Sequence, residues 1–121
     1  MAVTNGTAAV SVLQPMFLKP THDELFLHFK TIAGSIPDTP VLLYNNPGRV
    51  GYTLTTPLVD ELAHQMPNIV GMKDTSGDIT LTEEFIRRTR DVGVPYRPSL
   101  PPPAGAAWDG FVRTMTAAGL L

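Results

Sequence analysis

The sequence contains no cysteine, so disulfides, thiol nucleophiles and thiolate metal sites are all excluded. Charged residues are also few, at 17% of the chain, and the formal net charge is −2 at pH 7. Such a charge does not attract nucleic acid or an anionic membrane. No apolar run approaches the ~20 residues that span a bilayer, and the N-terminus lacks the basic and apolar regions of an export signal. We therefore expect a cytoplasmic protein that binds neither nucleic acid nor membrane.

The sequence does contain three short apolar segments, each followed by a segment whose apolar residues have helical spacing. Strands that are apolar throughout are typical of a parallel sheet covered by helices on both faces. Residues 8–91 are therefore predicted to form three βα units of an α/β fold. The predicted strands are Ala8–Leu13, Val41–Asn45 and Ile69–Lys73. The predicted helices follow a capping box at Thr21, begin with Thr56 as N-cap, and run from about Thr80 to Arg90.

The pattern breaks after the third unit. Residues 92–105 are predicted to be a Pro-rich linker, because Gly93–Pro103 carries five prolines and cannot pair as a central strand. Residues 106–118 are predicted to form a terminal helix on the spacing of Trp108, Phe111, Val112 and Met115. We expect one domain over residues 1–121, a length that supports a single modest core.

One lysine stands out as a candidate nucleophile. Lys73 ends the third apolar segment, whereas Lys19 follows a loop and Lys30 lies on the predicted wet face of a helix. Burial disfavours the ammonium form of a lysine, and a free amine can attack a ketone to form an imine. The alternative is a solvated lysine at the end of a strand. No metal is expected, since the three histidines lack the spacing of a metal site.

Further candidates follow the second apolar segment. Tyr44 ends it, and parallel strands joined by one helix would bring Tyr44 to the same rim as Lys73. A phenol there can relay protons, although a rim tyrosine can also simply place its hydroxyl in water. Arg49, in a Pro-Gly turn, suits a substrate carboxylate, but a lone arginine in a loop is more often a surface residue. Asn45 is a second candidate for substrate binding, and Asn45 and Asn46 can also orient the loop through bonds to its backbone.

These motifs resemble the dihydrodipicolinate synthase and N-acetylneuraminate lyase family of pyruvate-dependent class I aldolases. The resemblance covers about Ala8 to Arg90 and is most specific in Tyr44–Arg49 followed by Gly71–Asp74. It implies an incomplete (β/α)8 TIM barrel in which these strands are the fourth, fifth and sixth. It also implies that Lys73 is the imine lysine and Tyr44 the proton-relay tyrosine. Arg49 resembles the synthase branch, where an arginine binds the second substrate's carboxylate.

The resemblance implies a Schiff-base lyase acting on pyruvate or a related 2-keto acid and an aldehyde, with no cofactor because the imine forms with the substrate itself. The family's Gly-Thr-Thr-Gly loop is missing, and Gln14–Phe17 stands where members have Thr-Pro-Tyr-Tyr. A full barrel takes about 250 residues, so the alternative is a non-catalytic truncated remnant or interaction fragment. An open sheet exposes strand edges and apolar surface, which predicts self-association or a complementing chain.

Overall fold

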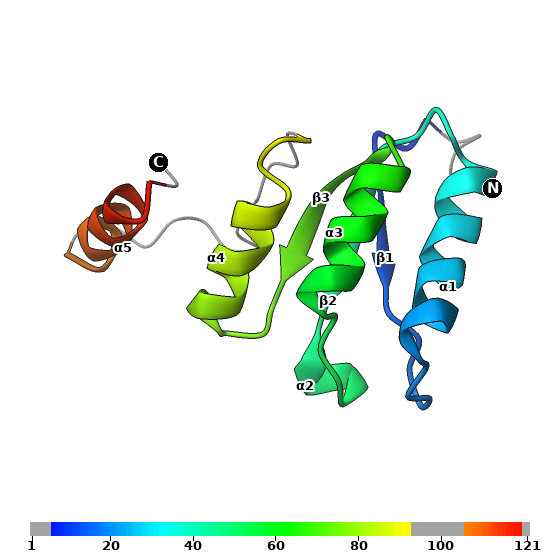
Figure 1. Ribbon diagram of the computed structural model, residues 1–121, viewed down its shortest axis with the longest axis horizontal. Helices are drawn as coiled ribbons and strands as arrows, with labels where there is room; N and C mark the ends of the chain where they lie inside the picture. The colour runs from blue at the N-terminus through cyan, green and yellow to red at the C-terminus, as the bar shows by residue number, and fades with distance from the viewer. Residues whose placement is uncertain (1–5, 93–105, 120–121) are drawn as a thin grey trace.

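The computed structural model describes residues 6–92 and 106–119, and it contains a three-stranded parallel sheet with strand order β1-β2-β3. Strands and helices alternate along the chain (Figure 1), as the sequence pattern predicts for an α/β fold. The elements in chain order are β1 (Val10–Leu13), α1 (His22–Ser35), β2 (Val41–Asn45), α2 (Pro47–Val50), α3 (Thr56–Gln65), β3 (Ile69–Asp74), α4 (Ile79–Arg88) and α5 (Ala106–Ala117).

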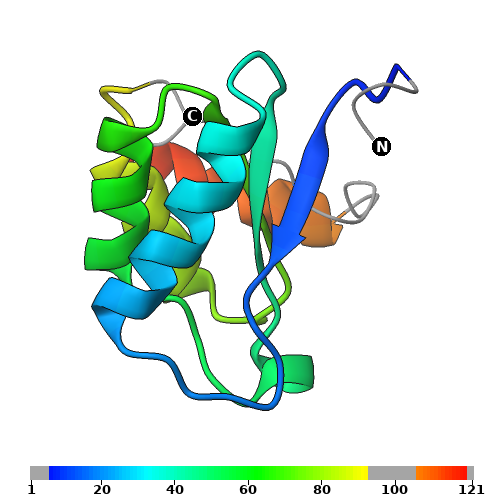
Figure 2. The ribbon, with the colours of Figure 1, turned by 90° about the vertical axis from the view of Figure 1, so that its right-hand side faces the viewer.

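The core lies between one face of the sheet and the helices that follow the strands. Figure 2 shows α1 and α3 side by side on that face. Apolar side chains from both helices and from β2 and β3 are almost fully buried there, and each contributes about 1.5–3 kcal/mol of burial free energy. The most buried members of this core are Phe29, Ala33, Val41, Leu43, Leu54, Leu58 and Leu62.

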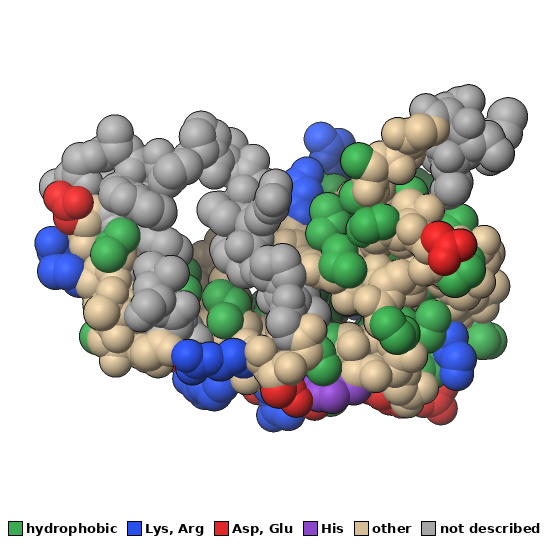
Figure 3. Space-filling model, turned by 90° about the horizontal axis from the view of Figure 1, so that it is seen from above, with side chains coloured by type: hydrophobic (Ala, Val, Ile, Leu, Met, Phe, Trp, Pro, Cys, Tyr) green, Lys and Arg blue, Asp and Glu red, His purple; other side chains and the backbone are tan. Residues whose placement is uncertain are grey.

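The other face of the sheet differs from the prediction that both faces are covered. Side chains along β2 alternate, with Val41, Leu43 and Asn45 buried and Leu42 and Tyr44 only partly buried. Alternation of this kind is typical of a sheet that packs on one face only. The physical reason is that the described helices in contact with the sheet lie on one side of it (Figure 2). Charged side chains gather along this helical side in Figure 3.

Two helix starts are fixed by local hydrogen bonds, of which the sequence predicts the one at Thr21. Thr21 caps α1 in a reciprocal capping box, in which the Thr21 amide donates to Glu24 Oε2 over 2.8 Å. Asp78 caps α4 by accepting from the amides of Thr80 and Leu81 at 3.0 and 3.1 Å. The capping box expected at Thr21 is confirmed, and the two caps fix where each helix leaves the preceding loop.

The boundaries of α3 and α4 differ slightly from the prediction. Thr55, not Thr56, is the N-cap of α3, and the Thr56 hydroxyl instead donates to Glu84 Oε1 on α4 over 3.0 Å. Helix α4 ends at Arg88, two residues before the predicted Arg90. The Thr56 hydroxyl, which the local sequence assigns to the cap of α3, thus forms a contact between α3 and α4 instead.

Helix α2 is a short element where the sequence predicts only a turn. It begins with Pro47, whose fixed φ suits a first helical turn. It ends at Val50, and the C-cap residue Gly51 has a φ of +86°, in the left-handed region that glycine adopts without strain. This single turn matters for the site because it carries Arg49 away from the end of β2.

The C-terminal prediction is confirmed in part. Helix α5 occupies Ala106–Ala117, close to the predicted 106–118. The predicted Pro-rich linker at 92–105 lies outside the described residues apart from Val92. Within the described ranges, no helix is both long and apolar enough to cross a membrane.

Candidate functional site

Tyr44 and Lys73 lie side by side at the carboxyl end of the sheet. They pair directly in the parallel register of β2 and β3. The Lys73 Nζ atom sits 4.1 Å from the centroid of the Tyr44 ring, a cation–π contact. The prediction that these two groups share one rim is therefore confirmed, and an amine and a phenol meet at the end of two parallel strands.

The Tyr44 hydroxyl accepts a hydrogen bond from the residue that follows β2. Asn46 Nδ2 donates to it over 2.7 Å. Desolvation raises the pKa of this phenol, but hydrogen bonding from Lys73, Thr75 and Asn46, with the positive charge of Lys73, outweighs it, so the pKa lies below its ordinary value. A phenol with a lowered pKa accepts and returns protons closer to neutral pH, which suits a relay.

Asn45 is placed differently from the prediction that it binds substrate. Its side chain is 0% exposed and points toward the helical side of the sheet. The amide nitrogen donates to Asp74 Oδ1 over 2.9 Å, and the amide oxygen accepts from the Leu54 amide over 3.0 Å. Because both ends of the amide are engaged in the interior, Asn45 orients the surrounding backbone, the other use expected of it, and does not face a substrate.

Asp74 is a buried residue that orients the chain at the candidate site, a role that the sequence analysis did not predict. The carboxylate is 7% exposed and accepts four hydrogen bonds, so its burial is fully compensated. The donors are Asn45 Nδ2, the Ser76 amide, the Ser76 hydroxyl and the Thr82 hydroxyl. The spacing Asp-x-Ser is the available sequence signal, since an aspartate bonds readily to the backbone two residues later. Asp74 thereby fixes the chain directly after Lys73.

The loop after β1 is joined to the end of β2 by Gln14. This side chain is 1% exposed; its Nε2 donates to the Tyr52 carbonyl over 2.6 Å, and its Oε1 accepts from the Asn46 amide over 3.2 Å. The Tyr52 hydroxyl donates in turn to the Pro15 carbonyl over 2.8 Å. Gln14, at first sight a departure from the family sequence, therefore holds the segment that carries Asn46.

A sequence profile of the dihydrodipicolinate synthetase family matches residues 1–96. The chain belongs to this family. Among curated family members, the 4-hydroxy-tetrahydrodipicolinate synthase of Methanoculleus marisnigri is 44% identical over 86 residues, and that of Thermus thermophilus is 37% identical over 87 residues. Each match covers 71% of this chain but only 28% or 29% of the relative. The chain thus spans less than a third of these relatives' length.

Solved structures of the dihydrodipicolinate synthase family share the fold. The dihydrodipicolinate synthase of Bacillus anthracis is 32% identical and superposes with a TM-score of 0.77, covering 98% of this chain and 37% of that one. The enzyme of Acinetobacter baumannii, solved as a chloride-inhibited complex with pyruvate, is 34% identical with a TM-score of 0.73, covering 80% and 32%. The three βα units are therefore a part of a larger family fold.

Arg49 is an exposed residue of the family motif. It lies on α2, which starts two residues after β2 ends, and its side chain is exposed. Among the residues the structure describes, none forms an ion pair with its guanidinium. The arginine is thus free to bind an anion at the same end of the sheet as Lys73, and its substrate-binding role stays a prediction.

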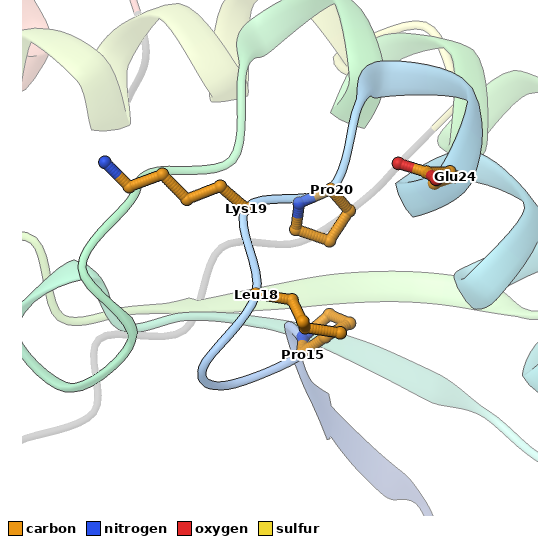
Figure 4. A pocket seen from close by; sticks show the side chains of 5 residues that line it. All are labelled: Pro15, Leu18, Lys19, Pro20 and Glu24. Atoms are coloured by element: carbon orange, nitrogen blue, oxygen red, sulfur yellow. The ribbon is translucent and has the colours of Figure 1, made fainter.

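The second half of the segment that stands where family members have Thr-Pro-Tyr-Tyr, Met16 and Phe17, is exposed and apolar. Phe17 is 95% exposed at a φ of +67°, and Leu18 is 66% exposed. Beside them is a hollow of about 380 Å³ lined by Pro15, Leu18, Lys19, Pro20 and Glu24. Figure 4 shows Leu18 close to Pro15 and the Lys19 side chain extending away from the other residues.

Within the described residues, no cluster of three histidine or acidic side chains is arranged to bind a metal.

Proposed function

We propose that this chain carries the imine-forming part of a Schiff-base lyase resembling 4-hydroxy-tetrahydrodipicolinate synthase. Lys73 is the amine that attacks the ketone of pyruvate or a related 2-keto acid. The observation that carries the proposal is the contact of Lys73 Nζ with the Tyr44 ring, 4.1 Å from its centroid, at paired strand ends. Family membership supports it, as does the relative that was solved with pyruvate.

The chemistry divides between the amine and the phenol. The Lys73 amine attacks the keto carbon, a C–N bond forms, and the former carbonyl oxygen leaves as water once it has been protonated. Tyr44 takes the proton that the attacking nitrogen releases and passes it to the former carbonyl oxygen. A second proton, supplied by solvent, lets that oxygen leave as water and leaves the imine protonated. The resulting protonated imine withdraws electrons, so the neighbouring methyl carbon loses a proton and becomes the nucleophile toward an aldehyde.

The second substrate is proposed to be bound through Arg49. A guanidinium presents two parallel donors to a carboxylate, and Arg49 is exposed at the end of the sheet that carries Lys73. The aldehyde is therefore expected to carry a carboxylate. No cofactor is required in this scheme, because the protonated imine itself accepts the electrons.

A second candidate function is that of a non-catalytic part of such an enzyme. Two observations favour it: the chain spans 28% of its curated relatives, and Leu42 and Tyr44 leave one face of the sheet only partly covered. On this account the strands bind to the remaining βα units of a barrel, or to another copy of the chain, and the imine forms only in the assembly.

Borohydride trapping tests the proposal. The chain is incubated with pyruvate and reduced, and the intact mass is compared among the unaltered chain, Lys73→Arg and Lys30→Arg. Lys30 is a matched control, because its Nζ lies 5.3 Å from the Phe26 ring centroid but far from the strand ends. The expected adduct is present in the unaltered chain and in Lys30→Arg and absent in Lys73→Arg. Equal labelling of all three would refute the proposal.

A further inference from the structure

The backbone of Asn46 is held from both sides as the chain leaves β2. Its amide donates to Gln14 Oε1 over 3.2 Å. Its carbonyl accepts from the amides of Arg49 and Val50, both at 3.1 Å, in the single turn of α2. With both backbone groups bonded, the direction in which the Asn46 side chain leaves the chain is set by the fold.

That side chain meets the Tyr44 hydroxyl. Asn46 Nδ2 donates to the phenol oxygen over 2.7 Å. An amide NH₂ group can only donate, so the phenol oxygen is the acceptor and its own proton remains available for another partner. A donated hydrogen bond stabilises a phenolate more than a neutral phenol, because the oxygen that accepts it carries more negative charge.

The amine lies over the ring of the same tyrosine. The Lys73 Nζ atom is 4.1 Å from the centroid of the Tyr44 ring, and Tyr44 and Lys73 are register partners. The pKa of Tyr44 lies below its ordinary value, since hydrogen bonding and the positive charge of Lys73 outweigh the opposing effect of desolvation. Asn46 is thus the hydrogen-bond donor to the phenol oxygen that directly follows β2, two residues after Tyr44.

We propose that Asn46 is a positioning residue: by donating to the Tyr44 hydroxyl, it keeps that oxygen ready to take a proton next to the Lys73 amine. Asn46 does not touch the substrate in this account and acts through Tyr44 alone. The inference rests on the proposed function, since it assigns Asn46 a task in imine formation at Lys73.

Two substitutions separate this role from a structural one. Asn46→Asp keeps the shape of the side chain but replaces the donor by an acceptor with a negative charge, and aspartate is well tolerated at a helix N-cap. Asn46→Leu removes the donor without adding charge. Gln65→Glu is the matched control, because it makes the same amide-to-carboxylate change at an exposed position on α3.

The first readout is the titration of the phenol, followed by phenolate absorption without any ligand. The Tyr44→Phe variant supplies the background of Tyr52 and Tyr96. Asn46→Asp is expected to raise the Tyr44 pKa by about one unit or more, Asn46→Leu to raise it less, and Gln65→Glu to leave it unchanged. Titrations of both Asn46 variants that coincide with the control would overturn the inference.

The second readout is the pH profile of the reduced pyruvate adduct. The pH at which adduct formation rises is expected to move upward in Asn46→Asp and to stay in place in Gln65→Glu. If the unaltered chain forms the adduct and all profiles coincide, the role of Asn46 is overturned while the proposed function stands. If the unaltered chain forms no adduct on Lys73, the proposed function fails, and the role of Asn46 fails with it whatever the titration shows.

Discussion

Asn45 Nδ2 donates a hydrogen bond to Asp74 Oδ1 over 2.9 Å and joins the last residue of β2 to the last residue of β3. Each of these buried side chains follows a candidate site residue, Tyr44 or Lys73, by one position. Side chains alternate between faces along a strand, so the interior pair and the site pair lie on opposite sides of the same two strands. The interior hydrogen bond therefore holds Tyr44 and Lys73 in register.

The first prediction concerns this interior bond. Asn45→Ala leaves the Leu54 amide without its acceptor and removes one donor from the buried Asp74 carboxylate. We expect a loss of about 1–3 kcal/mol in the free energy of unfolding, measured by urea denaturation. Gln65→Ala, which removes an exposed amide on α3, is expected to change it by less than about 0.5 kcal/mol. A loss for Asn45→Ala no larger than that of the control would contradict the role given to Asn45.

The second prediction concerns the phenol. Tyr44→Phe keeps the ring under Lys73 Nζ but removes the hydroxyl, so the adduct still forms on Lys73 at a rate lower by about 10²–10⁴-fold. The measurement is the rate of reduced pyruvate adduct by mass. Tyr52→Phe serves for comparison, since its hydroxyl donates to the Pro15 carbonyl and not toward Lys73. An unchanged rate in Tyr44→Phe would remove Tyr44 from the chemistry.

Much of this arrangement follows from the sequence because parallel strands joined by one helix end at the same rim. The apolar segments before Tyr44 and Lys73 are long enough to be recognised as strands, and their shared rim needs no tertiary detail. Asn45 was harder to interpret for a physical reason. If both faces of a strand are predicted to be buried, the alternation of side chains gives no reason to expect different surroundings for Tyr44 and Asn45. In the structure only the face that carries Asn45 is covered.

Other features depend on contacts between segments that are distant in sequence. The Thr56 hydroxyl is drawn to Glu84 on the next helix, so the cap moves to Thr55. Gln14 meets the Asn46 amide across 32 positions of sequence. Local propensity has no information about either contact, which is why the helix boundary and the role of Gln14 emerge only from the fold.

The third prediction concerns pH and the contact between α3 and the segment after α4. His64 Nε2 lies 3.0 Å from Asp91 Oδ2. Bonding to the Asp60 carbonyl, followed by bonding to Asp91, raises the pKa of His64 above 6.5, and bonding to His64 lowers the pKa of Asp91 below 3.8. The raised value contributes stability that is present below pH 6.5 and lost as the pH rises through the folded-state pKa of His64; the lowered value contributes stability that is lost as the pH falls below 3.8.

The corresponding experiment compares His64→Gln with the unaltered chain. The substitution is expected to lower the midpoint of urea unfolding at pH values between 3.8 and 6.5 more than at alkaline pH. His22→Gln is the comparison variant. His22 is an exposed histidine whose Nε2 lies 2.9 Å from Glu61 Oε2 on α3. If His64→Gln changes the midpoint of urea unfolding by the same amount at every pH, the charge of His64 does not contribute to stability.

The fourth prediction concerns the uncovered face of the sheet. Leu42 is only partly buried there, and β1 and β3 each pair with β2 alone among the described strands. We expect the chain to self-associate, or to bind the remaining βα units of a family barrel, as its concentration rises. Sedimentation velocity measures this, and Leu42→Asp should weaken association.

The control for that experiment is Leu27→Asp. Leu27 is 63% exposed on α1, on the helical side, so the same substitution there should leave association unchanged. A folded, monodisperse monomer at every concentration, unaffected by either substitution, would show that the partly covered face needs no partner.

The central claim is that the imine forms on one particular lysine, and peptide mapping of the unaltered chain after pyruvate and borohydride tests it most directly. Lys19, Lys30 and Lys73 are the three lysines of the chain, so they compete for the label within one molecule. The account predicts that the adduct lies on the peptide containing Lys73. Label distributed among all three lysines, or found mainly on Lys19 or Lys30, would contradict it.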